Sequence, residues 1–239
     1  LTRFADIFCP DRPRTQNDMK DSGRQEVIKV SRLVKAFDSF RAVDDISFNV
    51  RKGEIFGFLG ANGAGKTTAM RMLTGLSRPT SGHAEVAGFD VAAQHEQVKR
   101  HIGYMSQKFS LYGDLTVKEN LRLFGGIYGM AENDIKRKSH EAVERLDMKA
   151  LEDTLVRELP PGWKQKIAFT VSIMHNPEAV FLDEPTGGVD PKTRQQFWRL
   201  IYEAAGRGIT VFVTTHYMDE AEYCDRISIM VDGQIRAMG

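Results

Sequence analysis

Residues 60–68 constrain this chain more than any other stretch, because their glycines, lysine and threonines suit a loop that surrounds phosphate. An apolar run of strand character at 55–59 precedes them, and a segment of helical composition at 69–73 follows. This order of strand, loop and helix is the context in which such a motif binds phosphate, with inward N–H groups and the positive end of the helix. We therefore predict a phosphate-binding loop (P-loop) rather than a glycine-rich turn that matches by chance. The candidate nucleotide-binding residues of the loop are Gly60, Asn62, Gly63, Ala64, Gly65, Lys66, Thr67 and Thr68.

Four polar residues have specific expected roles in this chemistry. Lys66 is expected to reach the β- and γ-phosphates of ATP, and Thr67 to offer its hydroxyl to Mg²⁺. Asp183 and Glu184 follow the apolar run 180–182, at the carboxyl end of a predicted strand, where parallel α/β sheets bind ligands. Asp183 is expected to hold Mg²⁺ through its water shell, and Glu184 to polarise the attacking water. The alternative is a polar turn that merely ends a core strand.

Charge and cysteine content limit the classes of partner. The 239 residues include 33 Lys and Arg against 32 Asp and Glu, a net charge of +1, which argues against a nucleic-acid partner. The two cysteines, Cys9 and Cys224, are far apart and indicate neither a disulfide framework nor a metal cluster, as is typical of a reducing cytoplasm. No apolar run approaches the roughly 20 residues of a transmembrane helix, so we expect a soluble chain.

The first residues differ in composition from the rest. The chain starts without methionine, and residues 9–24 are rich in Asp, Arg, Pro, Gln and Asn. Such a composition indicates a linker or tail, here residues 1–25, before an ATPase domain at 26–239. An excised piece of a longer polypeptide or a trimmed chain would both look like this.

The remaining pattern predicts an α/β fold with a P-loop NTPase core and a mixed sheet. Strand-like runs at 27–30 and 46–50 predict an N-terminal antiparallel β portion, with expected turns at Asp44-Asp45 and Lys52-Gly53. Towards the other end of the chain, strands alternate with helices, which implies a parallel sheet with helices on its faces. A hairpin with its turn at Asp232-Gly233 closes the sequence.

An inserted α-helical subdomain is expected over about residues 116–175. Thr116 and Glu119 have the spacing of a capping box, which predicts the start of a helix. A second helix is expected over 132–148, with the basic run 136–138 on its solvated face.

Over about residues 27–239 the sequence resembles the ATPase subunits of ATP-binding cassette (ABC) transporters. The stretch that ends at Gln107 is similar to the family's Q-loop, the stretch 186–190 to its D-loop, and the stretch that ends at His216 to its switch histidine. The resemblance implies that Gln107 is a metal and water ligand and that His216 touches the γ-phosphate. It also implies nucleotide contacts for Asp190 and for Phe37, which would stack on adenine. Singly, Gln107, His216 and Phe37 also fit an ordinary loop glutamine, strand-end histidine and core phenylalanine, but the joint order and spacing of the motifs favour the family.

The resemblance also implies partners and a location. Segments 187–191 and 216–222 are similar to ATPases of bacterial drug exporters, and the segment from Phe109 to Asn120 lies where the family's integral membrane transport subunits dock. The chain would then lie on the cytoplasmic face of the inner membrane, held by its membrane partner. A second ATP-binding domain would complete a head-to-tail dimer, as a separate subunit or on the same polypeptide.

One segment departs from the family pattern. Leu159-Pro160-Pro161-Gly162-Trp163 replaces the Leu-Ser-Gly-Gly-Gln signature, so the serine hydroxyl is lost and each proline lacks an N–H donor. Gly162 and Gln165 remain as candidates for contact with a nucleotide across the dimer. We therefore expect a non-identical partner domain.

Two other classes of function are compatible with these motifs. One is a soluble ABC-type protein that acts on ribosomes or DNA, against which the charge balance argues. The other is a nucleotide-sensing module with little turnover, against which Glu184 argues. The transported substrate would be selected by membrane helices and is not encoded here.

Overall fold

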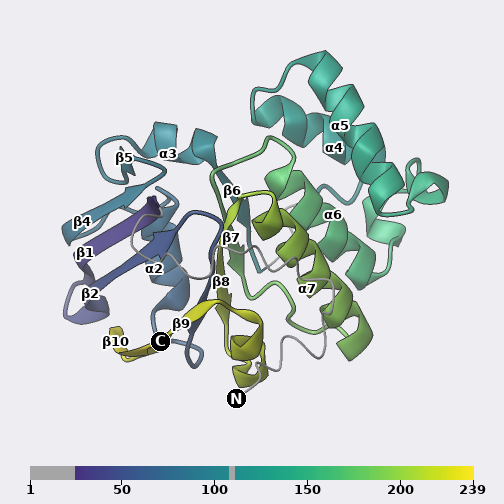
Figure 1. Ribbon diagram of the computed structural model, residues 1–239. Coiled ribbons are helices and arrows are strands. Elements are labelled where there is room, and N and C mark those ends of the chain that lie inside the picture. The colour runs from purple at the N-terminus through teal and green to yellow at the C-terminus, as the bar shows by residue number, and fades with distance from the viewer. Residues whose placement is uncertain (1–24, 108–110) are drawn as a thin grey trace.

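Two β-sheets form the frame of the chain in the computed structural model, which describes residues 25–107 and 111–239 (Figure 1). One sheet has four strands and the other has six. The sheets lie side by side, and the helices of the second half of the chain lie beyond the six-stranded sheet (Figure 1). Nearly all of the expected linker, with Cys9, and Phe109 of the expected docking segment lie outside the described residues.

The four-stranded sheet is antiparallel and has the order β2-β1-β4-β5. Its strands are β1 (Glu26–Phe37), β2 (Phe40–Arg51), β4 (Ser81–Val86) and β5 (Phe89–Asp90). The predicted antiparallel N-terminal portion is therefore confirmed.

The expected turn at Asp44-Asp45 is wrong, because both residues lie inside β2. Asp45 has a φ of 56°, and the pairing of β2 with β1 shifts register across these two residues, between Val43 and Ile46. Asp44 is held in the strand by its side chain, which accepts hydrogen bonds from Arg41 at 2.7 Å and Gln234 at 2.8 Å. Aspartate tolerates the left-handed backbone well, so the same residue type serves a strand irregularity as readily as a turn.

The six-stranded sheet has the order β10-β9-β3-β8-β7-β6 and is parallel except for β10. Its strands are β3 (Ile55–Leu59), β6 (Ile102–Met105), β7 (Ala179–Asp183), β8 (Thr210–Thr215), β9 (Arg226–Val231) and β10 (Gln234–Met238). The predicted final hairpin is confirmed, since Asp232 and Gly233 both have positive φ, 49° and 78°. Parallel pairing brings the carboxyl ends of β3, β7 and β8 to one edge of the sheet.

Two apolar cores cover the two faces of the six-stranded sheet. Between the sheets, Phe48 of β2 stacks on Phe56 of β3 with ring centroids 5.4 Å apart, and Phe212 of β8 lies beside both. On the opposite face, alternate residues of the same strands pack against the helices, where Phe169 and Trp198 are buried. Burial on both faces explains why these strands are continuous apolar runs in the sequence.

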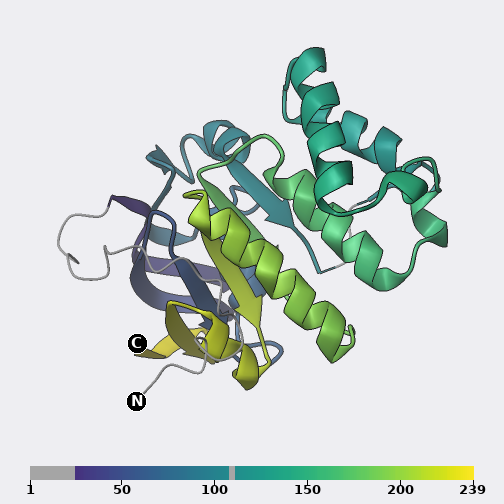
Figure 2. The same cartoon turned by 45° about the vertical axis from the view of Figure 1, so that its right-hand side comes forward.

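Most of the helices lie between β6 and β8 in the sequence. The structure has α2 (Lys66–Leu73), α3 (His95–His101), α4 (Val117–Ile127), α5 (Glu132–Arg145), α6 (Pro161–Ile173) and α7 (Pro191–Gly206), with 3-10 helices η1 (Lys149–Leu151), η2 (Val156–Glu158) and η3 (Met218–Tyr223). In Figure 2, α7 runs across the six-stranded sheet, whereas α4 and α5 stand apart from it. The capping box of Thr116 and Glu119 is confirmed at the start of α4. The boundary of the helical subdomain at 116–175 stays a prediction.

Helix α5 differs from its expected form in two respects. It ends at Arg145 rather than at residue 148, because Asp147 takes a left-handed backbone with φ 52°. Lys138 is half-buried, and its ammonium donates to the carbonyl of Met174 at 2.7 Å, so it does not share the solvated face of its basic neighbours. Within the described parts of the chain, no helix is both long and apolar enough to span a membrane.

A pair of stacked rings joins the helices to the edge strand β6. Tyr128, at the end of α4, stacks on His175, which follows α6, with centroids 3.8 Å apart and an interplanar angle of 11°. Nε2 of His175 lies 3.1 Å from the carbonyl oxygen of Ile102, and the backbone N–H of Tyr104 donates to the hydroxyl oxygen of Tyr128. Burial lowers the pKa of His175 to about 4, so the ring is neutral and Nε2 carries the donated proton.

Candidate functional site

The phosphate loop lies between β3 and α2, as the sequence predicts. Gly63 and Gly65 have φ angles of 84° and 104°, which favour glycine. A Cβ atom on Gly65 would collide with the carbonyl oxygen of Ala42 in β2, so the loop passes where only glycine fits. The first turn of α2 begins directly after it, and its free N–H groups face an incoming anion.

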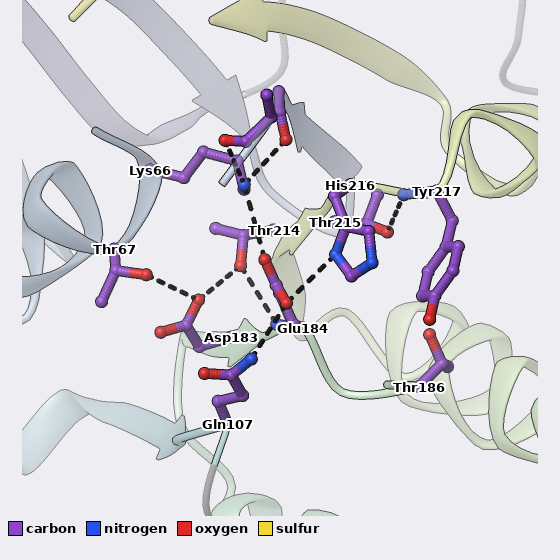
Figure 3. A network of polar contacts seen from close by, with 12 residues as sticks. Lys66, Thr67, Gln107, Asp183, Glu184, Thr186, Thr214, Thr215, His216 and Tyr217 are labelled. Carbon is purple, nitrogen blue, oxygen red and sulfur yellow. Dashed lines mark hydrogen bonds and ion pairs between the residues drawn. The ribbon is translucent and has the colours of Figure 1, made fainter. Parts of the chain in front are cut away.

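Lys66 is buried inside this loop. Its side chain is 4% exposed, and its ammonium donates to the carbonyl oxygens of Gly60 at 2.8 Å and Ala61 at 3.1 Å (Figure 3). The same nitrogen lies 3.4 Å from Oε1 of Glu184. The ammonium of Lys66 is therefore held in the loop by neutral carbonyl groups, which are weaker acceptors than phosphate oxygens would be.

Asp183 and Thr67 face each other across the edge of the sheet. Oδ1 of Asp183 accepts hydrogen bonds from the hydroxyl of Thr214 at 2.6 Å and from that of Thr67 at 3.3 Å (Figure 3). A carboxylate and a hydroxyl side by side are hard oxygen ligands, which fit Mg²⁺. The protein supplies few ligands here, so phosphate and water would complete the coordination, as is usual for Mg²⁺.

Glu184 lies at the centre of the site. Its side chain is 10% exposed, and Oε2 accepts a hydrogen bond from Gln107 at 3.1 Å. The same oxygen lies 3.1 Å from Nδ1 of His216, a close contact without the alignment of a hydrogen bond. With Lys66 at Oε1, three side chains from separate segments converge on this carboxylate (Figure 3).

The backbone of Glu184 is also unusual. Its φ is 48°, a left-handed conformation that is uncommon for glutamate and that surrounding contacts must maintain. The N–H of Glu184 is held by the carbonyl and the hydroxyl of Thr214, each at 3.1 Å. Thr214 thus holds both acidic residues of the site, because its hydroxyl also donates to Asp183.

Thr214 is a functional candidate that the sequence identified only as part of a motif. A sequence pattern could have identified it, since the apolar run of β8 ends in Thr214 and Thr215 at the carboxyl edge of the sheet. The contacts of Arg194 and Glu220, described below, were missed entirely, because nothing in the sequence separates them from ordinary surface charges.

Other predicted residues lie around this centre. Phe37 ends β1 and is 51% exposed, and the ammonium of Lys35 lies over one face of its ring, 5.1 Å from the centroid. In the loop, Asn62 is exposed, whereas Ala64 is buried and accepts a hydrogen bond from the N–H of Gly233 at 3.0 Å. The nucleotide contacts of these residues stay predictions.

Gln165 is placed differently from what the resemblance implies. Its side chain is fully buried, and Nε2 donates to the carbonyl oxygen of Pro185, directly after Glu184. A side chain so enclosed does not face a nucleotide on another domain. Gln165 instead connects α6 to the loop that follows β7.

The start of α6 is exposed and has few donors. Pro160 is its N-cap and Pro161 its first residue, and the cap makes no side-chain hydrogen bond among the residues that the structure describes. Gly162 packs on Thr193, whose methyl a Cβ atom at that position would approach to 2.8 Å. Asp190 accepts hydrogen bonds from the N–H and hydroxyl of Thr193, at 3.0 and 2.5 Å, so it caps α7. The hydrogen bonds from Thr193 hold the pKa of Asp190 below its usual value.

A glycine loop between the parallel strand β3 and a helix, with an acidic pair at the end of β7 on the same edge of the sheet, defines the class of P-loop nucleotide-binding proteins. The family model for ABC transporters matches residues 43–187. The chain belongs to the ABC transporter family, as an ATP-binding domain.

Relatives and solved structures agree with this assignment. The probable multidrug ABC transporter ATP-binding protein YbhF of Escherichia coli is 48% identical over 90% of this chain, and the chain spans 37% of that relative. The linearmycin resistance ATP-binding protein LnrL of Bacillus subtilis is 35% identical over 89% of this chain and 69% of its own length. The ADP conformation of MJ1267, an ATP-binding cassette of an ABC transporter, superposes with a TM-score of 0.81 at 26% identity, over 90% of this chain and 91% of that one.

Proposed function

We propose that this chain binds Mg²⁺-ATP and hydrolyses it, and that hydrolysis drives a membrane exporter. The observation that carries the proposal is the convergence of Lys66, Gln107 and His216 on Glu184, beside the oxygen pair of Thr67 and Asp183. The names of YbhF and LnrL, which refer to multidrug transport and linearmycin resistance, support the exporter class.

Each side chain has a defined part in the proposed reaction. Lys66 and the N–H groups of the loop would bind the phosphates, and Thr67 and Asp183 would hold Mg²⁺, which would neutralise phosphate charge. Glu184 accepts the proton of the attacking water, because its carboxylate is shielded from solvent and aimed at the loop. Gln107 and His216 orient that carboxylate, and His216 contacts the γ-phosphate.

The proposed partners follow from the family and the exposed start of α6. Integral membrane transport subunits would hold the chain at the cytoplasmic face of the inner membrane. A second ATP-binding domain would pack head-to-tail against it, on another subunit or on the same polypeptide. YbhF has the length for such a second domain, since 37% of it accounts for the match with this chain.

The test is ATP hydrolysis by the full-length protein assembled with its membrane subunits in lipid vesicles, measured as phosphate release. Glu184→Gln should keep ATP affinity and lower turnover by about 100-fold or more, since an amide cannot accept the proton. Glu144→Gln, a matched change at an exposed position of α5, should hydrolyse ATP like the parent. Parental turnover in Glu184→Gln would show that another group is the base.

A further inference from the structure

A group of polar contacts links the start of α7 to the segment after His216. The guanidinium of Arg194, in α7, lies over the ring of Tyr217 with its central carbon 4.6 Å from the centroid. Nη1 of Arg194 donates to Asp219 at 3.1 Å, and its Nε lies 3.8 Å from Oε1 of Glu220. One arginine therefore contacts three of the four residues that follow His216.

Within this group of contacts, the buried carboxylate of Glu220 requires a compensating positive charge. It is 0% exposed, and Oε2 has no hydrogen-bond partner among the described residues. Oε1 accepts a hydrogen bond from the hydroxyl of Thr186. A buried carboxylate is costly unless a positive charge compensates it, and Arg194 supplies that charge.

Both ends of the group adjoin candidate catalytic residues. Thr186 follows Glu184 by two residues, and Tyr217 follows His216 directly. The rings of His216 and Tyr217 lie 4.1 Å apart at the centroids, so the position of one ring limits the other (Figure 3). Contacts that hold Thr186 and Tyr217 therefore fix both sides of the 3.1 Å approach between Glu184 and His216.

The location of His216 makes such support necessary. It comes directly after β8, which ends at Thr215, so the hydrogen bonds of the sheet do not hold it. The N–H of Tyr217 donates to the hydroxyl of Thr215 at 3.0 Å, and the contacts of Arg194 secure the remainder of the segment against α7.

We propose that Arg194 is a positioning residue for ATP hydrolysis, which holds the segment 217–220 so that His216 faces Glu184 and the γ-phosphate. It acts through His216 and does not itself touch the nucleotide. The inference rests on the proposed ATPase function and adds to it the contacts that align the site.

The test measures ATP hydrolysis by the full-length protein with its membrane subunits. Arg194→Met keeps the aliphatic stem and removes the charge, and it should lower kcat about tenfold while KM for ATP stays within about twofold, because alignment rather than binding is lost. Arg199→Met, the same change at an exposed position of the same helix, should keep the parental kcat.

A double-mutant cycle then separates positioning from simple stabilisation. In a His216→Ala background, Arg194→Met should cause no further loss of kcat, because the residue through which it acts is gone. If Arg194→Met does not fold, as thermal unfolding would reveal, Arg194→Lys replaces it in the same cycle, since its ammonium still compensates Glu220. Additive losses, or an unchanged kcat in a folded Arg194 variant, would overturn the inference and leave the ATPase intact. Absence of hydrolysis by the parent would overturn the proposed function and this inference with it.

Discussion

The edge of the six-stranded sheet and the start of α6 are both expected to face a nucleotide, yet their polar groups are held in opposite ways. At the sheet edge, Lys66 and Glu184 are buried and joined to side chains from several strands and loops. At α6, Pro160 and Pro161 are exposed, and Gln165, the polar residue behind them, is directed into the core.

In the head-to-tail dimer that we propose, this difference gives the chain one organised half-site and one half-site with few donors. In a head-to-tail dimer the two halves belong to different nucleotides. A partner domain with its own complete signature would therefore complete the site at Lys66 and Glu184. The other nucleotide, which would contact α6 of this chain, would be bound less tightly in the closed state.

The largest expected effect tests the organised half. Lys66→Ala should weaken ATP binding by at least about 100-fold, because it removes a charge-assisted contact to the phosphates. Titration with a fluorescent ATP analogue measures this, and Lys52→Ala, at an exposed lysine before β3, is the matched control. Equal affinity in the Lys66 variant and the parent would remove the contrast between the two halves.

The second prediction concerns the junction between the helices and the sheet. The pKa of His175 is about 4 in the folded protein, against about 6.5 in an unfolded chain, so the unfolded state binds a proton more readily between these values. Stability should therefore be complete above about pH 6.5 and fall by at most about 3 kcal/mol as the pH drops to about 4.

Chemical denaturation across this pH range measures the effect. His175→Gln keeps a donor for the carbonyl of Ile102 but does not titrate, so its stability should change less over the same window. An equal pH dependence in this variant and the parent would show that another group causes it.

The third prediction concerns the half-site with few donors, at the start of α6. Replacing Pro160-Pro161 by Ser-Gly, in a Glu184→Gln background that retains ATP, should strengthen ATP-dependent dimerisation about tenfold, since it restores a hydroxyl and backbone donors. Light scattering with and without ATP measures the association. No gain would show that the prolines are neutral and that the difference between the two half-sites does not affect the free energy of dimerisation.

The smallest effect compares the starts of two helices. α4 has a reciprocal capping box, in which Thr116 accepts from the N–H of Glu119 at 3.2 Å and Glu119 accepts from the N–H of Thr116 at 2.8 Å. Thr116→Ala should lower the free energy of unfolding by about 1 kcal/mol, whereas Thr116→Ser, which keeps the hydroxyl, should restore most of it. Thermal unfolding distinguishes the two, and equal melting of Ala and Ser variants would contradict the role of the cap.

Features encoded in neighbouring residues could be predicted from the sequence. The phosphate loop, the acidic pair after β7, the capping box and the final hairpin each depend on a short pattern with a local physical cause. Features that depend on distant contacts could not. Asp45 looks like a turn residue, and only the pairing of Val43 and Ile46 with β1 shows that it lies within a strand.

The candidate site shows the same limit. The expected roles of Gln107 and His216 came from family resemblance, and the structure brings both side chains to Glu184 from separate segments. The inward direction of Gln165 follows from the position of Pro185, which lies 20 residues further along the chain. Likewise, the importance of Glu220 becomes visible only when its burial against Thr186 and Arg194 is known.

The stacked rings of Tyr128 and His175 have a further consequence for the protein at high concentration. β6 is an outer strand of its sheet, and outer strands offer unpaired backbone groups to which another chain can add. His175 donates to the carbonyl of Ile102, and the hydroxyl oxygen of Tyr128 accepts from the N–H of Tyr104. Ile102 and Tyr104 are the alternate residues whose backbone groups a neighbouring parallel strand would use. Two side chains just beyond the ends of α4 and α6 thus occupy the place of a seventh strand, and they protect this edge of the sheet from aggregation between copies of the chain.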